Sequence, residues 1–133
     1  MNQDVARIRA ARRRRSGQVA EDAACAALMR AGLRVVARNV GFRLGELDLV
    51  MRDGDTLVFV EVRFRQRTDY GSGAASVDPR KQQRMARAAA LYLSRAASGR
   101  QPACRFDVVE ATGDPDAPRL NWIRDAFRLD DLR

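Results

Sequence analysis

The sequence predicts an α/β domain with the element order α-β-β-β-α-β and an extended segment after it. Apolar residues recur at helical spacing over 16–31 and 79–97. Runs rich in β-branched and aromatic residues, bounded by turn residues, lie between and after these helices. The 133 residues, 46% of them hydrophobic, are enough for one modest core. We therefore expect one domain over 16–133, preceded by a basic arm over 1–15.

The arm carries Arg7, Arg9 and a run of four arginines over 12–15. Like charges repel, which predicts a loose or frayed helical segment. Such an arm either contacts phosphates or is a solvated tail, and the sequence leaves both open. Ser16 and Gly17 are then predicted to cap the first helix, which ends near Gly32. On the helical wheel Glu21 falls at the edge of the buried side.

Three strands are predicted over 33–40, 46–52 and 56–64. Asp53-Gly54-Asp55 is a strong hairpin signal between the second and the third. The third is apolar on both faces for most of its length, which is typical of a central strand.

The rest of the chain continues the α/β pattern. Residues 65–77 read as a mobile basic loop, after which Asp78 caps a helix with Pro79 at its first position. This helix pairs an apolar face with a stripe formed by Arg80, Arg84, Arg87 and Arg95. A fourth strand follows over 103–110, and an extended segment over 120–127.

Two acidic residues of the hairpin carry most of the chemical information. If the turn is Gly54-Asp55, Asp48 stands opposite Glu61, and Leu47, Leu49 and Met51 meet only apolar residues on the other face. A one-residue slip would bury carboxylates in that apolar layer.

Opposed carboxylates repel, so something must compensate for them. A hard divalent cation such as Mg²⁺ (or Mn²⁺) is one solution, because it binds carboxylate oxygens and keeps waters and phosphates as further ligands. Pairing of both acids with Arg63 and other arginines is the alternative, and the spacing does not decide between them.

Composition excludes several function classes. The chain has no histidine, which rules out Ser-His-Asp and Cys-His catalysis and histidine-ligated zinc. Cys25 and Cys104 are far apart in apolar runs and suggest no secreted scaffold. Without a secretory signal or an apolar span, we expect a cytoplasmic protein with no membrane partner. The net charge of +8 points to a polyanionic partner, most often nucleic acid.

Over most of its length, from Gly17 to about Phe127, the sequence resembles the YraN family. These small bacterial proteins are similar in fold to archaeal Holliday junction resolvases and restriction endonucleases. The matching pieces are Gly17-Gln18-Val19-Ala20-Glu21, Asn39, Gly45-Glu46-Leu47-Asp48-Leu49, Leu57-Val58-Phe59-Val60-Glu61-Val62-Arg63, Lys81 and Arg105-Phe106-Asp107-Val108-Val109.

The resemblance implies a restriction-endonuclease-like fold, with a central mixed sheet flanked by helices, and a PD-(D/E)xK-type site. Asp48 stands at the metal-binding aspartate of that motif and Glu61 at its second acidic ligand. Glu21 stands where related nucleases place an additional acid, and the carbonyl of Val62 would be a further ligand.

The chain departs from the motif at its lysine, because Arg63 stands there. Arginine holds a phosphate and stabilises negative charge, but it does not act as a base. Lys81, the only lysine, lies near the edge of its helix's buried face, and we consider it as a replacement. Glu46 shares the face of Asp48. We interpret it as a charged residue at the edge of the site whose polar contacts are satisfied and which takes no part in the chemistry.

These features together predict a metal-dependent endonuclease acting on DNA, with branched or structured DNA as a candidate substrate. Its catalytic residues would be Glu21, Asp48, Glu61, Arg63 and Lys81. A catalytically inactive nucleic-acid-binding module is the second reading, since fold does not entail activity. A protein-binding adaptor, with arginines of the second helix contacting acids, is the third. A homodimer is plausible because junction-cleaving enzymes pair two sites, although no sequence feature requires one.

Overall fold

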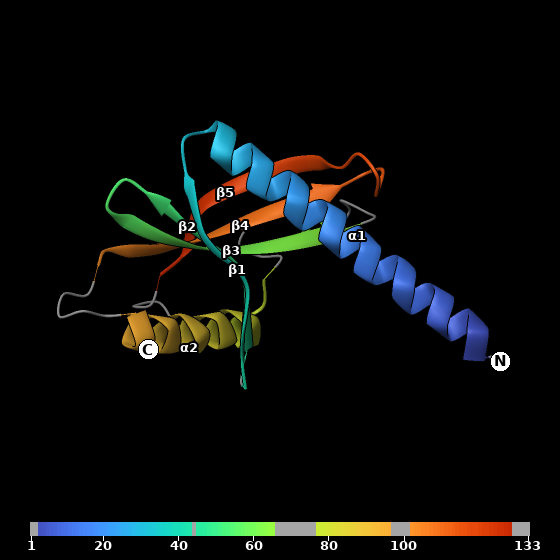
Figure 1. The fold of residues 1–133 in the computed structure, drawn as a ribbon, viewed down its shortest axis with the longest axis horizontal. Coiled ribbons are helices and arrows are strands. Elements are labelled where there is room, and N and C mark those ends of the chain that lie inside the picture. The colour runs from blue at the N-terminus through green and yellow to red at the C-terminus, as the bar shows by residue number, and fades with distance from the viewer. Residues whose placement is uncertain (1–2, 44, 66–76, 97–101, 129–133) are drawn as a thin grey trace.

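Two helices cover opposite faces of one five-stranded sheet (Figure 1) in the computed structural model, which describes residues 3–43, 45–65, 77–96 and 102–128. The predicted element order is confirmed, and the extended segment is a fifth strand. The predicted basic loop over 65–77 lies mainly outside the described residues. The elements are α1 (Gln3–Arg30), β1 (Arg34–Phe42), β2 (Gly45–Asp53), β3 (Thr56–Arg65), α2 (Pro79–Ala96), β4 (Cys104–Thr112) and β5 (Arg119–Phe127).

The sheet is mixed, with the strand order β1-β2-β3-β4-β5. β3 and β4 are parallel and are joined through α2, whereas the other neighbouring strands are antiparallel. A parallel pair needs such a crossover connection, usually a helix. β3 lies in the middle, as its two apolar faces predict. This mixed sheet flanked by helices is the predicted restriction-endonuclease-like architecture.

The hairpin has the predicted register. Asp53 pairs with Thr56, and the pairing continues residue by residue to Leu49 and Val60. Side chains alternate between the faces, so Leu49 and Val60 pack in the cluster that α1 covers. Val50 and Phe59 pack in the other cluster, under α2.

One predicted position in this hairpin is wrong. Leu47 was expected on the face of Leu49, but it packs in the α2 cluster. The sheet is irregular at this point, because the pairing of β1 with β2 passes over Asn39 and Asp48, and Asn39 of β1 has a φ of 52°. Asparagine tolerates this left-handed conformation better than most residues. The pairing with β3 stops at Leu49, although both strands continue.

α1 begins at Gln3, so the predicted cap at Ser16 is wrong and the helix continues through the expected boundary of the arm. Arginine and alanine are good helix formers, and each like-charge pair costs only a few tenths of a kcal/mol. No side chain between residues 3 and 15 is buried, and Ala20 is the first buried one among the side chains that the structure describes. In the described segments, no helix is long and apolar enough to cross a membrane.

α2 begins where its capping residues predict. The side chain of Asp78 accepts a hydrogen bond from the backbone N–H of Lys81 at 2.9 Å. This is the usual bond of an N-cap to the third helical residue, and it places Lys81 in the first turn. Of the predicted apolar face, Met85, Ala88, Ala89 and Leu93 are buried and Tyr92 is half-buried, whereas the side chain of Ala96 lies outside the described part.

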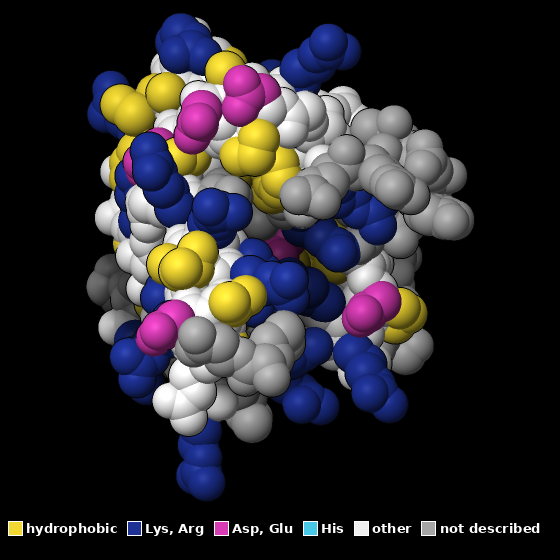
Figure 2. Space-filling model, turned by 90° about the vertical axis from the view of Figure 1, so that its right-hand side faces the viewer, with side chains coloured by type: hydrophobic (Ala, Val, Ile, Leu, Met, Phe, Trp, Pro, Cys, Tyr) yellow, Lys and Arg dark blue, Asp and Glu magenta, His cyan; other side chains and the backbone are white. Residues whose placement is uncertain are grey.

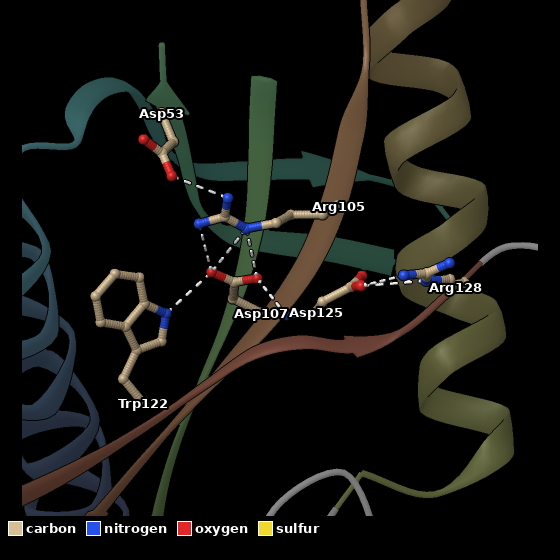
Figure 3. Close-up of polar contacts among 6 residues, drawn as sticks. All are labelled: Asp53, Arg105, Asp107, Trp122, Asp125 and Arg128. Carbon is tan, nitrogen blue, oxygen red and sulfur yellow. Dashed lines mark hydrogen bonds and ion pairs between the residues drawn. The ribbon is translucent and has the colours of Figure 1, made fainter. Parts of the chain in front are cut away.

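A buried carboxylate links β4 and β5, the last two strands in the order of the sheet (Figure 3). Asp107 is fully buried and accepts hydrogen bonds from Trp122 Nε1 and the Asp125 backbone, each at 2.9 Å. It also pairs with Arg105, which reaches Asp53 at the tip of the hairpin. A buried charge is tolerated when it is paired in this way, so we assign the cluster a structural role.

A candidate acidic cleft

A cleft of about 310 Å³ lies where β2 and β3 cease to pair. Because the strands part there, residues from both covering helices reach the same space. Figure 2, viewed from the side toward which the N-terminal end of α1 extends, shows Lys and Arg side chains around a recess with an acidic side chain inside. The lining residues come from four elements: Gly17, Ala20 and Glu21 of α1; Gly45, Glu46 and Asp48 of β2; Glu61, Val62 and Phe64 of β3; and Lys81, Arg84 and Met85 of α2.

Asp48 bridges the gap between the parting strands. Its Oδ2 accepts a hydrogen bond from the backbone N–H of Val62 at 2.9 Å. Burial raises its pKa from the ordinary value of 3.8 to about 7. The charge of Glu61 and a hydrogen bond between the two carboxyl groups add to this increase, whereas Val62 and Lys81 oppose it. The two acids are therefore immediate neighbours, as the register predicts, and together they favour a shared proton or a cation.

Glu61 is the more deeply buried of the pair, with 4% of its side chain exposed. The ammonium group of Lys81 contacts its Oε1. Because Lys81 stands in the first turn of α2, the cap at Asp78 fixes the point from which this side chain reaches the cleft. The only lysine of the chain thus lies beside the acidic pair, as considered from the sequence.

Glu21 enters the cleft from α1 and, as predicted, lies at the edge of the buried side, with 16% of its side chain exposed. Burial raises its pKa, and the nearby charge of Asp48 raises it further. Arg38 lies 3.9 Å away and opposes this rise. With its amide nitrogen facing the acids, Asn39 donates to Glu21 at 2.9 Å and to Glu46 at 3.2 Å.

Of the predicted site residues, Glu21, Asp48, Glu61, Val62 and Lys81 line the cleft, and Arg63 is not among its lining residues. The charge of Arg63 instead helps to lower the pKa of Asp78. Arg84, expected only as part of a basic stripe, lines the cleft one turn beyond Lys81.

The residues of the cleft fit a hard divalent cation only in part. Within the described residues, no group of three or more His, Cys, Asp and Glu side chains is arranged to hold a metal ion. Mg²⁺, however, is usually bound by one or two carboxylates together with waters and substrate phosphates. Asp48 and Glu61 supply that minimal set, so the donor chemistry fits Mg²⁺ better than a metal that requires a closed protein cage.

The sequence pattern predicted no role for Asn39 and did not indicate the contribution of Gly45. A Cβ at Gly45 would lie 3.0 Å from the carbonyl oxygen of Arg84, so glycine permits the close approach of β2 to α2. The signal available for Asn39 was its residue type, since asparagine is depleted in strands and is common at left-handed positions. Nothing in the sequence indicates which helix turn Gly45 approaches.

Comparison with known proteins identifies the family. The model of UPF0102, described as an uncharacterised protein family, matches residues 20–111. A UPF0102 protein of Xanthomonas campestris pv. campestris (strain B100) is 57% identical over 91% of this chain and 98% of its own length. A UPF0102 protein of Xylella fastidiosa (strain 9a5c) is 56% identical over 90% of this chain and 97% of its own length. The matched segment includes Glu21, Asp48, Glu61 and Lys81. The chain therefore belongs to the UPF0102 family, the YraN family that its motifs resemble.

Proposed function

We propose that this protein is a metal-dependent endonuclease that hydrolyses phosphodiester bonds in DNA. The observation that carries the proposal is the convergence of Asp48 and Glu61 in one cleft, beside Lys81 and Arg84. Adjacent carboxylates are costly unless a cation or a proton offsets their repulsion, and such costs are concentrated at functional sites. The net charge of +8 favours a polyanionic substrate.

In this proposal Asp48 and Glu61 would hold Mg²⁺ or Mn²⁺, with the Val62 carbonyl as a further ligand and Glu21 acting through water. A bound Mg²⁺ lowers the pKa of a coordinated water and neutralises phosphate charge. The Val62 N–H keeps the Asp48 carboxylate turned into the cleft. Asn39 and Arg38 hold the side chain of Glu21 at the margin of the cleft.

Lys81, rather than Arg63, takes the role of the motif's lysine. Its ammonium group already contacts Glu61 and is placed to orient a water molecule or to stabilise charge on a phosphate. Arg84 lines the same cleft and provides a guanidinium group for a phosphate oxygen. The departure of the sequence from the motif at position 63 is therefore compatible with activity.

A nucleic-acid-binding module without turnover is the second candidate. The contact of Lys81 with Glu61 favours it, because that ion pair offsets part of the acidic repulsion without a metal. This candidate predicts salt-sensitive binding and no metal-dependent cleavage.

The deciding experiment is a cleavage assay on four-way-junction and linear duplex DNA, with Mg²⁺, Mn²⁺ or EDTA. The endonuclease proposal predicts cleavage with either metal, none in EDTA, and a loss of about 100-fold or more in Asp48→Ala. Asp114→Ala, in the exposed β4–β5 connection, is the matched control and keeps its activity. Binding without cleavage under every condition supports the second candidate, and cleavage by Asp48→Ala at the parent rate contradicts the proposed site.

A further inference from the structure

The first half of α1 carries a high density of positive charge and lies outside the packed domain. Residues 3–15 contain six arginines and one aspartate, a net charge of +5 out of +8 for the whole chain. None of their side chains is buried. Most of the charge that points to a polyanionic partner therefore lies in this basic arm and not in the walls of the cleft.

The basic arm has a fixed position relative to the cleft, because the helix that carries the arm also contributes residues to the lining of the cleft. Glu21 lines the cleft, and Arg7 lies fourteen residues before it in the same unbroken helix. At 1.5 Å per residue the separation along the axis is about 21 Å. In Figure 1 the blue end of α1 extends past the sheet on the side where α2 begins, which is also the side of the cleft.

The packing of the domain does not account for the basic arm. Arginines three or four residues apart, such as Arg9 with Arg12 and Arg13, repel one another and weaken the helix. The exposed large apolar side chains in the arm are limited to Val5 and Ile8, too few for the broad apolar face of a helix that lies on a membrane. Charge complementarity therefore favours a polyanion that is neither part of this domain nor a lipid surface.

We propose that the basic arm binds the phosphate backbone of a DNA duplex that flanks the phosphate held in the cleft. A rigid helix holds its charges at fixed positions along a straight axis, which suits a stiff duplex better than a flexible single strand. With 3.4 Å per base pair, the arm reaches about six base pairs from the cleft. The inference rests on the proposed nucleic-acid substrate, but it does not require cleavage.

The test compares two variants with the same loss of charge. The arm variant carries Arg12→Ala, Arg13→Ala and Arg14→Ala, and the control variant carries Arg30→Ala, Arg34→Ala and Arg52→Ala, near the other end of α1. All six residues are exposed, and alanine keeps helical propensity at the four positions that lie in α1. Binding to a fluorescent DNA duplex, to the matching single strand and to anionic vesicles is measured in EDTA over a range of salt.

We expect the arm variant to bind the duplex about tenfold or more weakly at physiological salt, and the slope of log Kd against log salt to fall by about one to three. The control variant should change affinity by less than about threefold, and the single strand should lose less than the duplex. Equal losses in both variants, an equal loss on single strands, or tighter binding of the arm to vesicles than to duplex would overturn the inference.

A parallel cleavage assay separates this inference from the proposed function. Arm-dependent duplex binding by a protein that never cuts DNA contradicts the endonuclease and supports the role of the arm. Cleavage that is unchanged in the arm variant, on substrates with either short or long flanking duplexes, supports the endonuclease and contradicts the role of the arm.

Discussion

At the scale of single residues, Asp48 is a carboxyl group whose pKa the fold raises. Its pKa is about 7 in the folded protein, against an ordinary value of 3.8. A raised pKa means that folding is favoured below pH 4 and that this stability is lost as pH rises toward 7. Asp48→Asn removes the ionisation, and its amide oxygen can still accept the Val62 N–H.

We therefore predict that Asp48→Asn is more stable than the parent above pH 7 in EDTA, by an amount on the order of 2 kcal/mol. The difference should disappear near pH 4, as measured by urea unfolding across pH. Asp22→Asn is a control of opposite sign, because Arg38 lowers the pKa of Asp22 and its loss destabilises the protein at neutral pH. A pH-independent gain in Asp48→Asn would contradict the prediction.

Also at this scale, the structure separates the two basic residues that compete for the lysine role. Lys81 contacts Glu61, whereas Arg63 is not among the residues that line the cleft. In the cleavage assay, we predict that Lys81→Met lowers the rate about 100-fold and Arg63→Met less than tenfold. Methionine keeps an unbranched apolar side chain at each position and removes the charge. A larger loss of cleavage rate in Arg63→Met than in Lys81→Met would mean that Arg63, and not Lys81, has the role of the motif's lysine.

At the scale of elements, the contact between β2 and α2 depends on a glycine. A Cβ at Gly45 would lie 3.0 Å from the Arg84 carbonyl oxygen, whereas a Cβ at Gly41 would meet nothing within 4 Å. Gly45→Ala should destabilise the fold by about 1–2 kcal/mol, because a strand or helix must move to relieve the contact. Gly41→Ala should stay within about 0.5 kcal/mol of the parent in the same denaturant titration. Equal effects would mean that the contact does not limit the fold.

The elements themselves could be predicted closely, because each depends on local chemistry. Apolar alternation fixed the hairpin register, and Asp78 with Pro79 marked the start of α2. The start of α1 was misplaced because charge repulsion was given more weight than helical propensity. Leu47 was misplaced because a period-two pattern cannot show where a strand becomes irregular.

At the scale of the whole molecule, the site depends on long-range placement that a sequence does not record. The register brought Asp48 to Glu61, but only the packing of α2 on the sheet shows that Lys81 reaches Glu61. Asp107 is a second example. In the sequence it is only an acid near apolar residues, and its partners Arg105 and Trp122 are known only from the structure. Pairings across one hairpin are readable from pattern, whereas contacts between layers are not.

The basic arm should extend from the domain without adding to its stability. No side chain over residues 3–15 is buried, and Ala20 is the first residue of α1 that is described as buried. A chain that begins at Ser16 should therefore keep its free energy of unfolding within about 0.5 kcal/mol of the full chain, with a similar denaturant slope. Far-UV circular dichroism should show a loss of helix. A fall of more than about 2 kcal/mol would show that the arm contributes to the core and is not an appendage available for a partner.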